Sequence, residues 1–262
     1  MHLSKHHGLG NDFLVALDAD GDLDVGADLA RSLCDRRRGV GADGLIVARP
    51  AGEGAAARML LWNADGSRAE LSGNGLRCLG QALVRAGWAG DDHVVSTDAG
   101  PRQLRLVERI DDRTAVLAVE MGTAAELALP EGLDAVTPPS QAQAGVDVGN
   151  PHIVLVGGEA AGADPGVVGP AVEALVPGGV NVHLVAVSGL DELTMSIWER
   201  GAGRTEACGT GATAAAWAAR RLGLVADRVR VVMPGGTATV LVGEPLVLEG
   251  PATHVADLEV HA

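Results

Sequence analysis

An internal duplication constrains the fold of this chain more than any other sequence feature. Residues 59–87 align without a gap with residues 195–223, at an offset of 136. Nine of the 29 aligned positions are identical, and Trp62 and Trp198 are among them. Because the whole chain has only four tryptophans, chance similarity between two Gly- and Ala-rich segments does not explain the match. We therefore interpret the chain as two copies of one structural unit.

Each copy predicts the same run of elements. A strand, at 59–62 or 195–198, leads to the sequence S/C-G-x-G and then to a helix that ends at Gly87 or Gly223, since glycine favours helix termini. The second helix is apolar around most of its circumference, which is typical of a buried helix. The runs that follow alternate or are β-branched, and they predict antiparallel strands at 102–107, 114–121, 228–233 and 237–242. Each unit is thus expected to wrap a sheet around one central helix.

The duplication also predicts two domains. The first is expected at 1–117, completed by a returning strand at 251–262, and the second at 118–250. Within the second domain, segment 123–145 carries three prolines and is predicted to be a loop.

Charge and composition exclude several classes of partner. The formal net charge is −14, and aromatic residues make up 2% of the chain. Nucleic-acid binding depends on basic patches and aromatic stacking platforms, so nucleic acid is not an expected partner. No apolar run reaches the length of a membrane span, and the first residues do not form a signal peptide. We therefore expect no membrane association and a cytoplasmic location.

The sequence also argues against bound metals and cofactors. Lys5 is the only lysine and lies in no recognisable cofactor motif, so pyridoxal phosphate is not expected. The stretch from Gly39 to Gly44 matches the dinucleotide fingerprint as a string, but it precedes a strand instead of opening a helix. Three widely spaced cysteines and eight histidines show no zinc-ligand spacing, so no metal is predicted. The basic cluster at 36–38 is interpreted as a solvated helix end, and Cys78 as core packing.

The chemistry is expected at the two S/C-G-x-G segments. The first N–H groups of a helix lack intrahelical partners and the helix dipole favours negative charge there, so each helix start can hold a substrate carboxylate. Cys208 in this field should have a lowered thiol pKa and act as a base, and Ser72 occupies the equivalent position. Stereoinversion requires proton-transfer groups on opposite faces of one carbon. The paired segments therefore predict an amino-acid epimerase.

Eight motifs extend this prediction along essentially the whole chain: KHHGLGNDF, DRRRGVGADG, NADGSRAELSGNGLRC, GNPH, VNV, ERGAGRTEACGTGA, MPGG and GPATHV. Together, and in this order, they resemble the diaminopimelate epimerase family. The resemblance implies an α+β fold of two pseudo-symmetric repeat domains, each a barrel-like mixed β-sheet wrapped around a central helix. It also implies cofactor-independent epimerisation of L,L-2,6-diaminopimelate to the meso form, a step of lysine and peptidoglycan biosynthesis. Members of this isomerase family are commonly homodimers.

Carried over residue by residue, the resemblance assigns a site. The catalytic residues would be Cys208, Ser72, Glu199 and His152, with the last two polarising the first two. The substrate-binding residues would be Asn11, Asn63, Gly73, Asn74, Asn150, Asn181, Glu199, Arg200, Gly209 and Thr210. An arginine with several asparagines suits a substrate with two zwitterionic ends, because guanidinium binds a carboxylate through two hydrogen bonds.

Ser72 is the one serious departure from the family pattern, which has a second cysteine at this position. A serine hydroxyl is a poor base without activation. Because the forward and reverse reactions share a transition state, both directions would slow. Three readings are open: Ser72 is natural and activated by His152 or Glu199, or it is a replacement that traps an inactive form, or the protein works on one face only or merely binds an amino acid. An epimerase of hydroxyproline or proline type on the same fold is the alternative enzyme.

Overall fold

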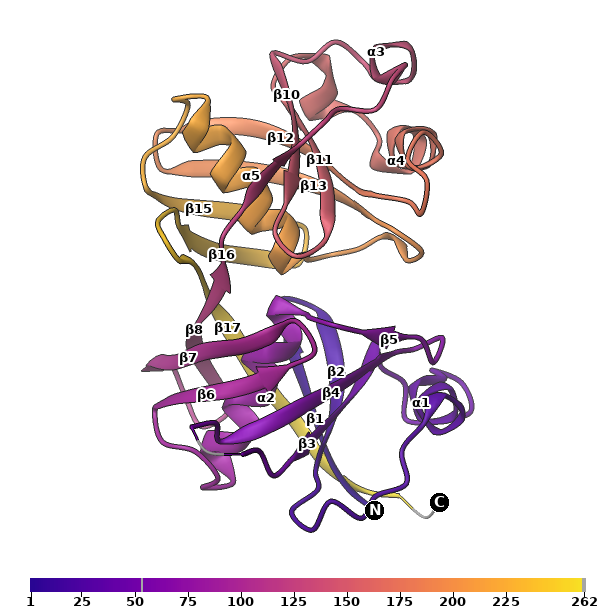
Figure 1. Ribbon diagram of the computed structural model, residues 1–262, viewed down its shortest axis with the longest axis vertical. Coiled ribbons are helices and arrows are strands. Elements are labelled where there is room, and N and C mark those ends of the chain that lie inside the picture. The colour runs from indigo at the N-terminus through magenta and orange to yellow at the C-terminus, as the bar shows by residue number, and fades with distance from the viewer. Residues whose placement is uncertain (53, 261–262) are drawn as a thin grey trace. The chain divides into compact units, whose positions relative to one another are not determined.

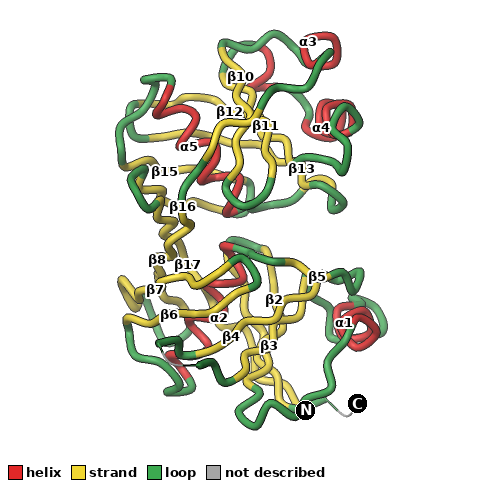
Figure 2. The backbone as a smooth tube through the Cα atoms, viewed as in Figure 1, coloured by secondary structure: helices red, strands yellow, loops and turns green. Residues whose placement is uncertain are grey.

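The computed structural model describes residues 1–52 and 54–260 (Figure 1). Internal contacts divide the chain into two units, of which one comprises Met1–Glu120 with Gly250–Ala262 and the other Met121–Glu249. Both units combine strands, helices and loops (Figure 2). Within the described ranges, no helix is long and apolar enough to cross a membrane.

In the residues that the structure describes, the first unit is a mixed sheet with two helices. Its elements are β1 (His2–Gly8), β2 (Asn11–Leu17), α1 (Ala27–Cys34), β3 (Gly44–Arg49), β4 (Ala57–Asn63), β5 (Arg68–Ala69), α2 (Gly73–Arg85), β6 (Asp92–Thr97), β7 (Gly100–Arg109) and β8 (Thr114–Gly122). β1 pairs antiparallel with β2, β2 parallel with β3, and β3 antiparallel with β4. β4 and β6 are parallel, and β7 lies antiparallel between β6 and β8.

The second unit has the same kinds of element. They are β9 (Ala125–Leu127), α3 (Leu133–Val136), β10 (Ala142–Asp147), β11 (Pro151–Val156), the 3-10 helix η1 (Glu159–Gly162), α4 (Pro165–Glu173), β12 (Asn181–Gly189), β13 (Glu192–Glu199), β14 (Gly203–Arg204), α5 (Gly209–Arg221), β15 (Arg228–Met233), β16 (Gly236–Leu241) and the first residues of β17 (Leu246–Glu259), whose remainder belongs to the first unit. β11 and β12 are parallel, as are β13 and β15, while β15 and β16 are antiparallel. The first part of β17 pairs with β16, and its last part returns to pair with β1.

The elements repeat at the offset seen in the sequence. Adding 136 to the bounds of α2 gives those of α5, and adding 136 to the bounds of β6 gives those of β15. The parallel pair β2–β3 corresponds to β11–β12, and β4–β6 corresponds to β13–β15. The prediction of an α+β fold with two pseudo-symmetric repeat domains is confirmed.

The two central helices are buried within their own units. α2 contacts β1, β2, β3 and β7, and α5 contacts β10 to β13 as well as β15 and β16. Gly87 and Gly223 follow the helix ends with φ of 73° and 71°, a left-handed conformation that glycine adopts without strain. The predicted wrapping of a barrel-like mixed sheet around a central helix is thus confirmed, as are the predicted antiparallel strand pairs β7–β8 and β15–β16.

The prediction of a loop at 123–145 is wrong. This segment contains β9, α3 and the start of β10, and β9 pairs antiparallel with β10. Gly145 lies opposite Leu127 in this ladder, and a Cβ at Gly145 would fall 2.4 Å from the Leu127 carbonyl oxygen. The prolines that suggested a loop lie between these elements, where they interrupt no ladder hydrogen bond.

Trp198 joins the outer helix α4 to β13. Its indole N–H donates to Glu173 Oε2 at 2.7 Å. Its ring lies directly on Gly169, where a Cβ would fall 2.1 Å from the ring atom Cγ. Buried apolar side chains surround this contact, among them Leu155, Val168, Val172 and Val182. Because β13 ends one residue after Trp198, at Glu199, the packing of α4 fixes the end of this strand.

We expect Gly169→Ala to lower the free energy of unfolding by about 1–3 kcal/mol or more, because the added methyl group would occupy the space of a rigid indole ring. Helix propensity alone would instead predict a gain of about 1 kcal/mol. Urea denaturation followed by tryptophan fluorescence measures the difference. The control is Gly162→Ala, whose Cβ would meet nothing within 4 Å. Equal stability of the two variants would contradict the close packing of α4 on Trp198.

Candidate active site

Ser72 and Cys208 hold the same position at the starts of α2 and α5. Each immediately precedes its helix, and each side chain accepts a hydrogen bond from the backbone N–H three residues further on. The distance is 3.0 Å between Ser72 Oγ and Gly75 N, and 3.3 Å between Cys208 Sγ and Gly211 N. Serine is among the preferred residues at this position and cysteine is not. The second helix therefore carries a thiol where capping alone would favour a hydroxyl.

Cys208 is buried among polar groups. Gly209 and Thr210 open α5 directly after it, and Thr210 Oγ1 lies 3.5 Å from Cys208 Sγ. Burial, and then the negative charge of Glu199, raise the pKa of the Cys208 thiol well above its ordinary value, while hydrogen bonds from Thr210 and Gly211 oppose the rise. The prediction that the helix start lowers this pKa is therefore wrong, because desolvation and a neighbouring carboxylate outweigh the helix start. At neutral pH the group is a thiol, hydrogen-bonded to Glu199.

Three predicted site residues meet where β12 begins and β13 ends. Glu199, the last residue of β13, accepts a hydrogen bond from Thr205 Oγ1 at 2.5 Å. The backbone N–H of Arg200 donates to Asn181 Oδ1 at 3.1 Å, and Asn181 is the first residue of β12. The guanidinium of Arg200 donates to the carbonyl of Gly178 at 3.3 Å. These bonds fix the direction in which the Glu199 and Arg200 side chains leave the sheet.

His152 lies in β11 and is fully buried. Its Nε2 is 2.8 Å from Asn150 Oδ1, and Asn150 Nδ2 donates to Thr210 Oγ1 at 3.5 Å. Its Nδ1 is 2.8 Å from Nε2 of His183 in β12, which is also fully buried. Burial lowers the pKa of His183 to about 3 and that of His152 well below its ordinary value, so both rings are neutral at neutral pH. Hydrogen bonds thus connect the predicted residues Asn150, His152, Thr210 and Cys208.

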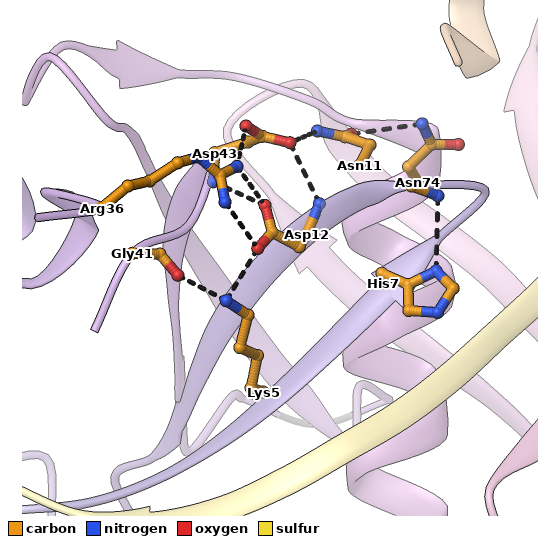
Figure 3. A network of polar contacts seen from close by, with 9 residues as sticks. Lys5, His7, Asn11, Asp12, Arg36, Gly41, Asp43 and Asn74 are labelled. Carbon is orange, nitrogen blue, oxygen red and sulfur yellow. Dashed lines mark hydrogen bonds and ion pairs between the residues drawn. The ribbon is translucent and has the colours of Figure 1, made fainter. Parts of the chain in front are cut away.

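Asn11 and Asn74 meet beside the start of α2 in the first unit (Figure 3). Asn74, which with Gly73 opens this helix, donates from Nδ2 to Asn11 Oδ1 at 3.2 Å. Asn11 in turn donates from Nδ2 to Asp43 Oδ2 at 2.8 Å. Three residues further along α2, the buried Arg77 donates to Asn74 Oδ1 at 2.6 Å. Both asparagine side chains are therefore held in one orientation.

A charged network centred on Asp12 supports Asn11 (Figure 3). Arg36 lies 2.7 Å from carboxylate oxygens of both Asp12 and Asp43, and Lys5 Nζ lies 2.9 Å from Asp12 Oδ2. Burial opposes ionisation of Asp12, but hydrogen bonds from Arg36 and Lys5 outweigh it and lower the pKa of this carboxyl. The basic cluster at 36–38 is exposed just after α1, as predicted for a solvated helix end, and the Arg36 guanidinium in addition joins two carboxylates.

One predicted residue stands apart, and two supporting residues were missed. Asn63 ends β4 with an exposed side chain and donates to Ser67 Oγ at 3.0 Å in the following turn. The two supporting residues are Thr205 and His183, which no sequence motif marked as part of the site. In the first unit the apolar Ile46 of β3 holds the register position that His183 holds in β12, so this histidine has no polar counterpart there.

No metal centre is apparent within residues 1–52 and 54–260, where no three His, Cys, Asp or Glu side chains are arranged to hold an ion. The cysteines Cys34, Cys78 and Cys208 are buried free thiols. The core position predicted for Cys78 is confirmed. Lys5, the only lysine, donates to the Gly41 carbonyl at 2.6 Å in addition to its ion pair with Asp12.

The sequence matches one family of known proteins over most of its length. The family model described as "Diaminopimelate epimerase" matches residues 3–127 and 145–255. The chain belongs to the diaminopimelate epimerase family. Two relatives with that name, from Rhizorhabdus wittichii and Sphingopyxis alaskensis, are each 38% identical to it. The matches cover 97% and 98% of this chain, and 93% and 96% of the relatives.

Two solved structures with this fold are more distant in sequence than these relatives. A predicted epimerase from Pseudomonas aeruginosa superposes with a TM-score of 0.77 at 18% identity, over 100% of this chain and 99% of the other. A hydroxyproline epimerase from Agrobacterium vitis, with bound trans-4-OH-L-proline, gives 0.69 at 16% identity, over 98% and 91%. At these identities the likeness shows a shared fold. The family resemblance drawn from the eight motifs is confirmed.

We expect Glu199→Gln to lower the pKa of the Cys208 thiol, because the substitution removes a negative charge that disfavours the thiolate. The chain contains no tyrosine, so ultraviolet thiolate absorbance can be followed to alkaline pH without a tyrosinate signal. Burial raises the pKa of Cys34 to about 11 and that of Cys78 to about 12, so these thiols titrate late. Subtracting the titration of a Cys208→Ala variant from that of the parent protein isolates the absorbance change of Cys208.

The control for this titration is Glu206→Gln, which removes an exposed carboxylate two residues before Cys208. We expect this change to leave the midpoint of the Cys208 absorbance change nearly in place. A midpoint that does not move in Glu199→Gln would contradict the charge coupling between Glu199 and the thiol.

Proposed function

We propose that the protein catalyses the epimerisation of L,L-2,6-diaminopimelate to meso-diaminopimelate by two-base proton transfer. The proposal is supported by membership of the diaminopimelate epimerase family and by 38% identity to relatives of that name over nearly the whole chain. The reaction makes the protein an isomerase of lysine and peptidoglycan biosynthesis. It needs no cofactor, because α-proton removal and return require only an acid–base pair and a site that stabilises the carbanion.

The observation that carries the proposal is the pair of equivalent helix starts. Ser72 and Cys208 occupy one position in two copies of the same unit, and each is hydrogen-bonded to the backbone N–H of the third helical residue. Stereoinversion needs two proton-transfer groups that approach one carbon from opposite faces, and a duplicated unit supplies two equivalent groups. We therefore assign Cys208 to one face of the α-carbon and Ser72 to the other.

Cys208 acts as the base on its face. Its thiol is hydrogen-bonded to Glu199, so this carboxylate is the group that accepts the thiol proton when the thiolate forms. The hydrogen bond from Gly211 N–H, at 3.3 Å, stabilises the thiolate. Thr205 holds Glu199 through a hydrogen bond of 2.5 Å. The high thiol pKa also gives a strong base once the proton has left.

Ser72 acts as the proton donor and acceptor on the opposite face. Its hydroxyl needs activation, and the family resemblance offers His152 or Glu199 for this role; both nitrogens of the buried His152 ring are hydrogen-bonded, to His183 and Asn150. A serine in place of a thiol makes this half of the reaction the slower one. A general base in good position contributes roughly 10²–10⁴-fold to the rate, which bounds the loss.

The remaining assigned residues bind the substrate. The helix starts direct backbone N–H groups toward the reacting carboxylate, whose negative charge the helix dipoles favour. Arg200 binds the distal carboxylate through two hydrogen bonds, which favours a substrate with two zwitterionic ends. The full proposed binding set is Asn11, Asn63, Gly73, Asn74, Asn150, Asn181, Glu199, Arg200, Gly209 and Thr210. We further propose that the protein is a cytoplasmic homodimer.

Incubation of the protein with L,L- and meso-diaminopimelate in deuterated water tests the function directly. Loss of the α-proton and the stereochemistry of the product are followed together. Inversion of both isomers supports the epimerase. Exchange without inversion on one isomer would show that Cys208 works alone. Binding without exchange would exclude both diaminopimelate epimerisation and one-sided catalysis, and turnover of hydroxyproline instead would identify the alternative enzyme.

We expect Ser72→Cys to raise the rate of inversion by about 10²–10⁴-fold, because a thiol supplies the base that the hydroxyl provides poorly. Stability should change by less than the roughly 1 kcal/mol of a lost serine cap, because Cys208 shows that a thiol can cap the equivalent helix.

Two controls accompany this prediction. Ser96→Cys adds a thiol on β6 and should leave the rate unchanged. Ser72→Ala should abolish residual inversion if the hydroxyl transfers the proton. An equal rate in the wild type and in Ser72→Cys would contradict the assignment of this position to proton transfer.

A further inference from the structure

His183 is a fully buried histidine that the proposed mechanism does not use. Its Nε2 lies 2.8 Å from Nδ1 of His152, and the two rings stack with centroids 5.0 Å apart. Its ring also lies directly against the first turn of α5, since a Cβ on Gly211 would fall 2.3 Å from His183 Cε1. Only glycine at position 211 leaves room for this ring. The His183 ring thus packs between His152 of β11 and the first turn of α5, directly after Cys208.

The contacts form one continuous chain of hydrogen bonds from His183 to the thiol. His183 contacts His152 at 2.8 Å, and His152 contacts Asn150 at 2.8 Å. Asn150 contacts Thr210 at 3.5 Å, and Thr210 contacts Cys208 at 3.5 Å. Each neutral imidazole has one N–H donor and one acceptor nitrogen, and an amide has a donor and an acceptor end. The whole series of hydrogen bonds can therefore run in only two directions: every group donates either toward Cys208 or toward His183.

The unpartnered nitrogen at the His183 end of this hydrogen-bond series determines in which direction the groups donate. Within the described residues, Nδ1 of His183 is buried and has no hydrogen-bond partner. If the chain ran from Cys208 toward His183, this atom would carry a buried N–H with no acceptor, the arrangement that proteins most strongly avoid. If the chain runs from His183 toward Cys208, the same atom is an unprotonated nitrogen, which is more easily tolerated. Glu199 favours the same direction, because the Cys208 proton is already hydrogen-bonded to that carboxylate.

We propose that His183 is a positioning residue that holds His152 in its Nε2–H tautomer and, through Asn150 and Thr210, points the Thr210 hydroxyl proton at the Cys208 sulfur. His183 Nε2–H donates to His152 Nδ1, and His152 Nε2–H donates to Asn150 Oδ1. Asn150 Nδ2–H then donates to Thr210 Oγ1, which leaves the hydroxyl proton free to bind the sulfur. Thr210 and Gly211 thus both donate to Cys208, and both favour its thiolate. The link to catalysis rests on the proposed function, but the direction of the chain does not.

The first unit supplies a matched substitution. Ile46 occupies the register position of His183, and its Cδ1 lies 3.3 Å from a Cβ built on Gly75, the counterpart of Gly211. An isoleucine therefore fits against a glycine in the first turn of a central helix. His183→Ile removes the donor to His152, whereas His183→Gln keeps an amide N–H that can donate to it.

Nitrogen-15 NMR of histidine-labelled protein tests the direction. In the wild type we expect His152 and His183 both to be Nε2–H tautomers, with signals assigned by their loss in His152→Gln and His183→Ile. In His183→Ile the His152 Nδ1 signal should move to the value of a nitrogen that accepts no hydrogen bond, and in His183→Gln it should stay at its wild-type value. An Nδ1–H tautomer of His152 in the wild type would overturn the proposal, and so would an unchanged His152 in a folded His183→Ile. The wild-type spectrum decides the direction even if a variant does not fold, and it needs no turnover of diaminopimelate.

Thiolate absorbance tests whether the chain reaches Cys208. In a Glu199→Gln background, where the carboxylate that raises the thiol pKa is absent, His183→Ile should move the midpoint of the Cys208 absorbance change upward by about one pH unit, the size of one net hydrogen bond. His183→Gln should restore the midpoint. If His183 had a purely structural role, both variants would change the free energy of unfolding, but the midpoints of their Cys208 absorbance changes would not differ. Equal midpoints of the Cys208 absorbance change in the two variants would overturn the proposed connection from His183 to Cys208.

Discussion

The cap at the start of each central helix is the contact on which both halves of the proposed site depend. Ser72 Oγ accepts a hydrogen bond from the Gly75 N–H, and Cys208 Sγ accepts one from the Gly211 N–H. Without these bonds each N–H would be buried without a partner. This bond fixes the reactive oxygen or sulfur relative to the helix axis, and the remaining first-turn N–H groups stay available for an anion. Reactive group and anion site are thus placed by one local structure, repeated at an offset of 136.

Two opposing electrostatic effects meet at Cys208. The helix start and the hydrogen bonds from Thr210 and Gly211 favour a thiolate, while burial and the charge of Glu199 disfavour it more strongly. The result is a protonated thiol beside a carboxylate. Such a pair stores the proton on sulfur at rest and forms a strong base when Glu199 accepts that proton. A base of this kind suits an α-proton that is only weakly acidic.

The two helix starts are equivalent, but the structures that support them are not. In the first unit, the charged Asp43, which is paired with Arg36, binds Asn11 beside the helix start (Figure 3). In the second unit, the corresponding support is a neutral chain of two histidines and an amide. The two histidines of this chain are fully buried, where an ion pair would lose more hydration energy than it recovers. The charged network lies nearer the solvent, with half of the Arg36 side chain exposed, and this loss is smaller there.

Local patterns that an ungapped repeat preserves were enough to predict the duplication, the central helices and their glycine ends, and the equivalence of Ser72 and Cys208. The motifs also predicted the family correctly. Three properties were decided only by the tertiary structure. Segment 123–145 forms strands and a helix because β9 finds β10 as a partner, and its prolines concealed this pairing. The thiol pKa of Cys208 rises because distant residues bury it and bring Glu199 beside it. His183 reaches both His152 and α5 because a parallel strand places its ring against a glycine, and spatial contacts of this kind leave no periodic signal in a sequence.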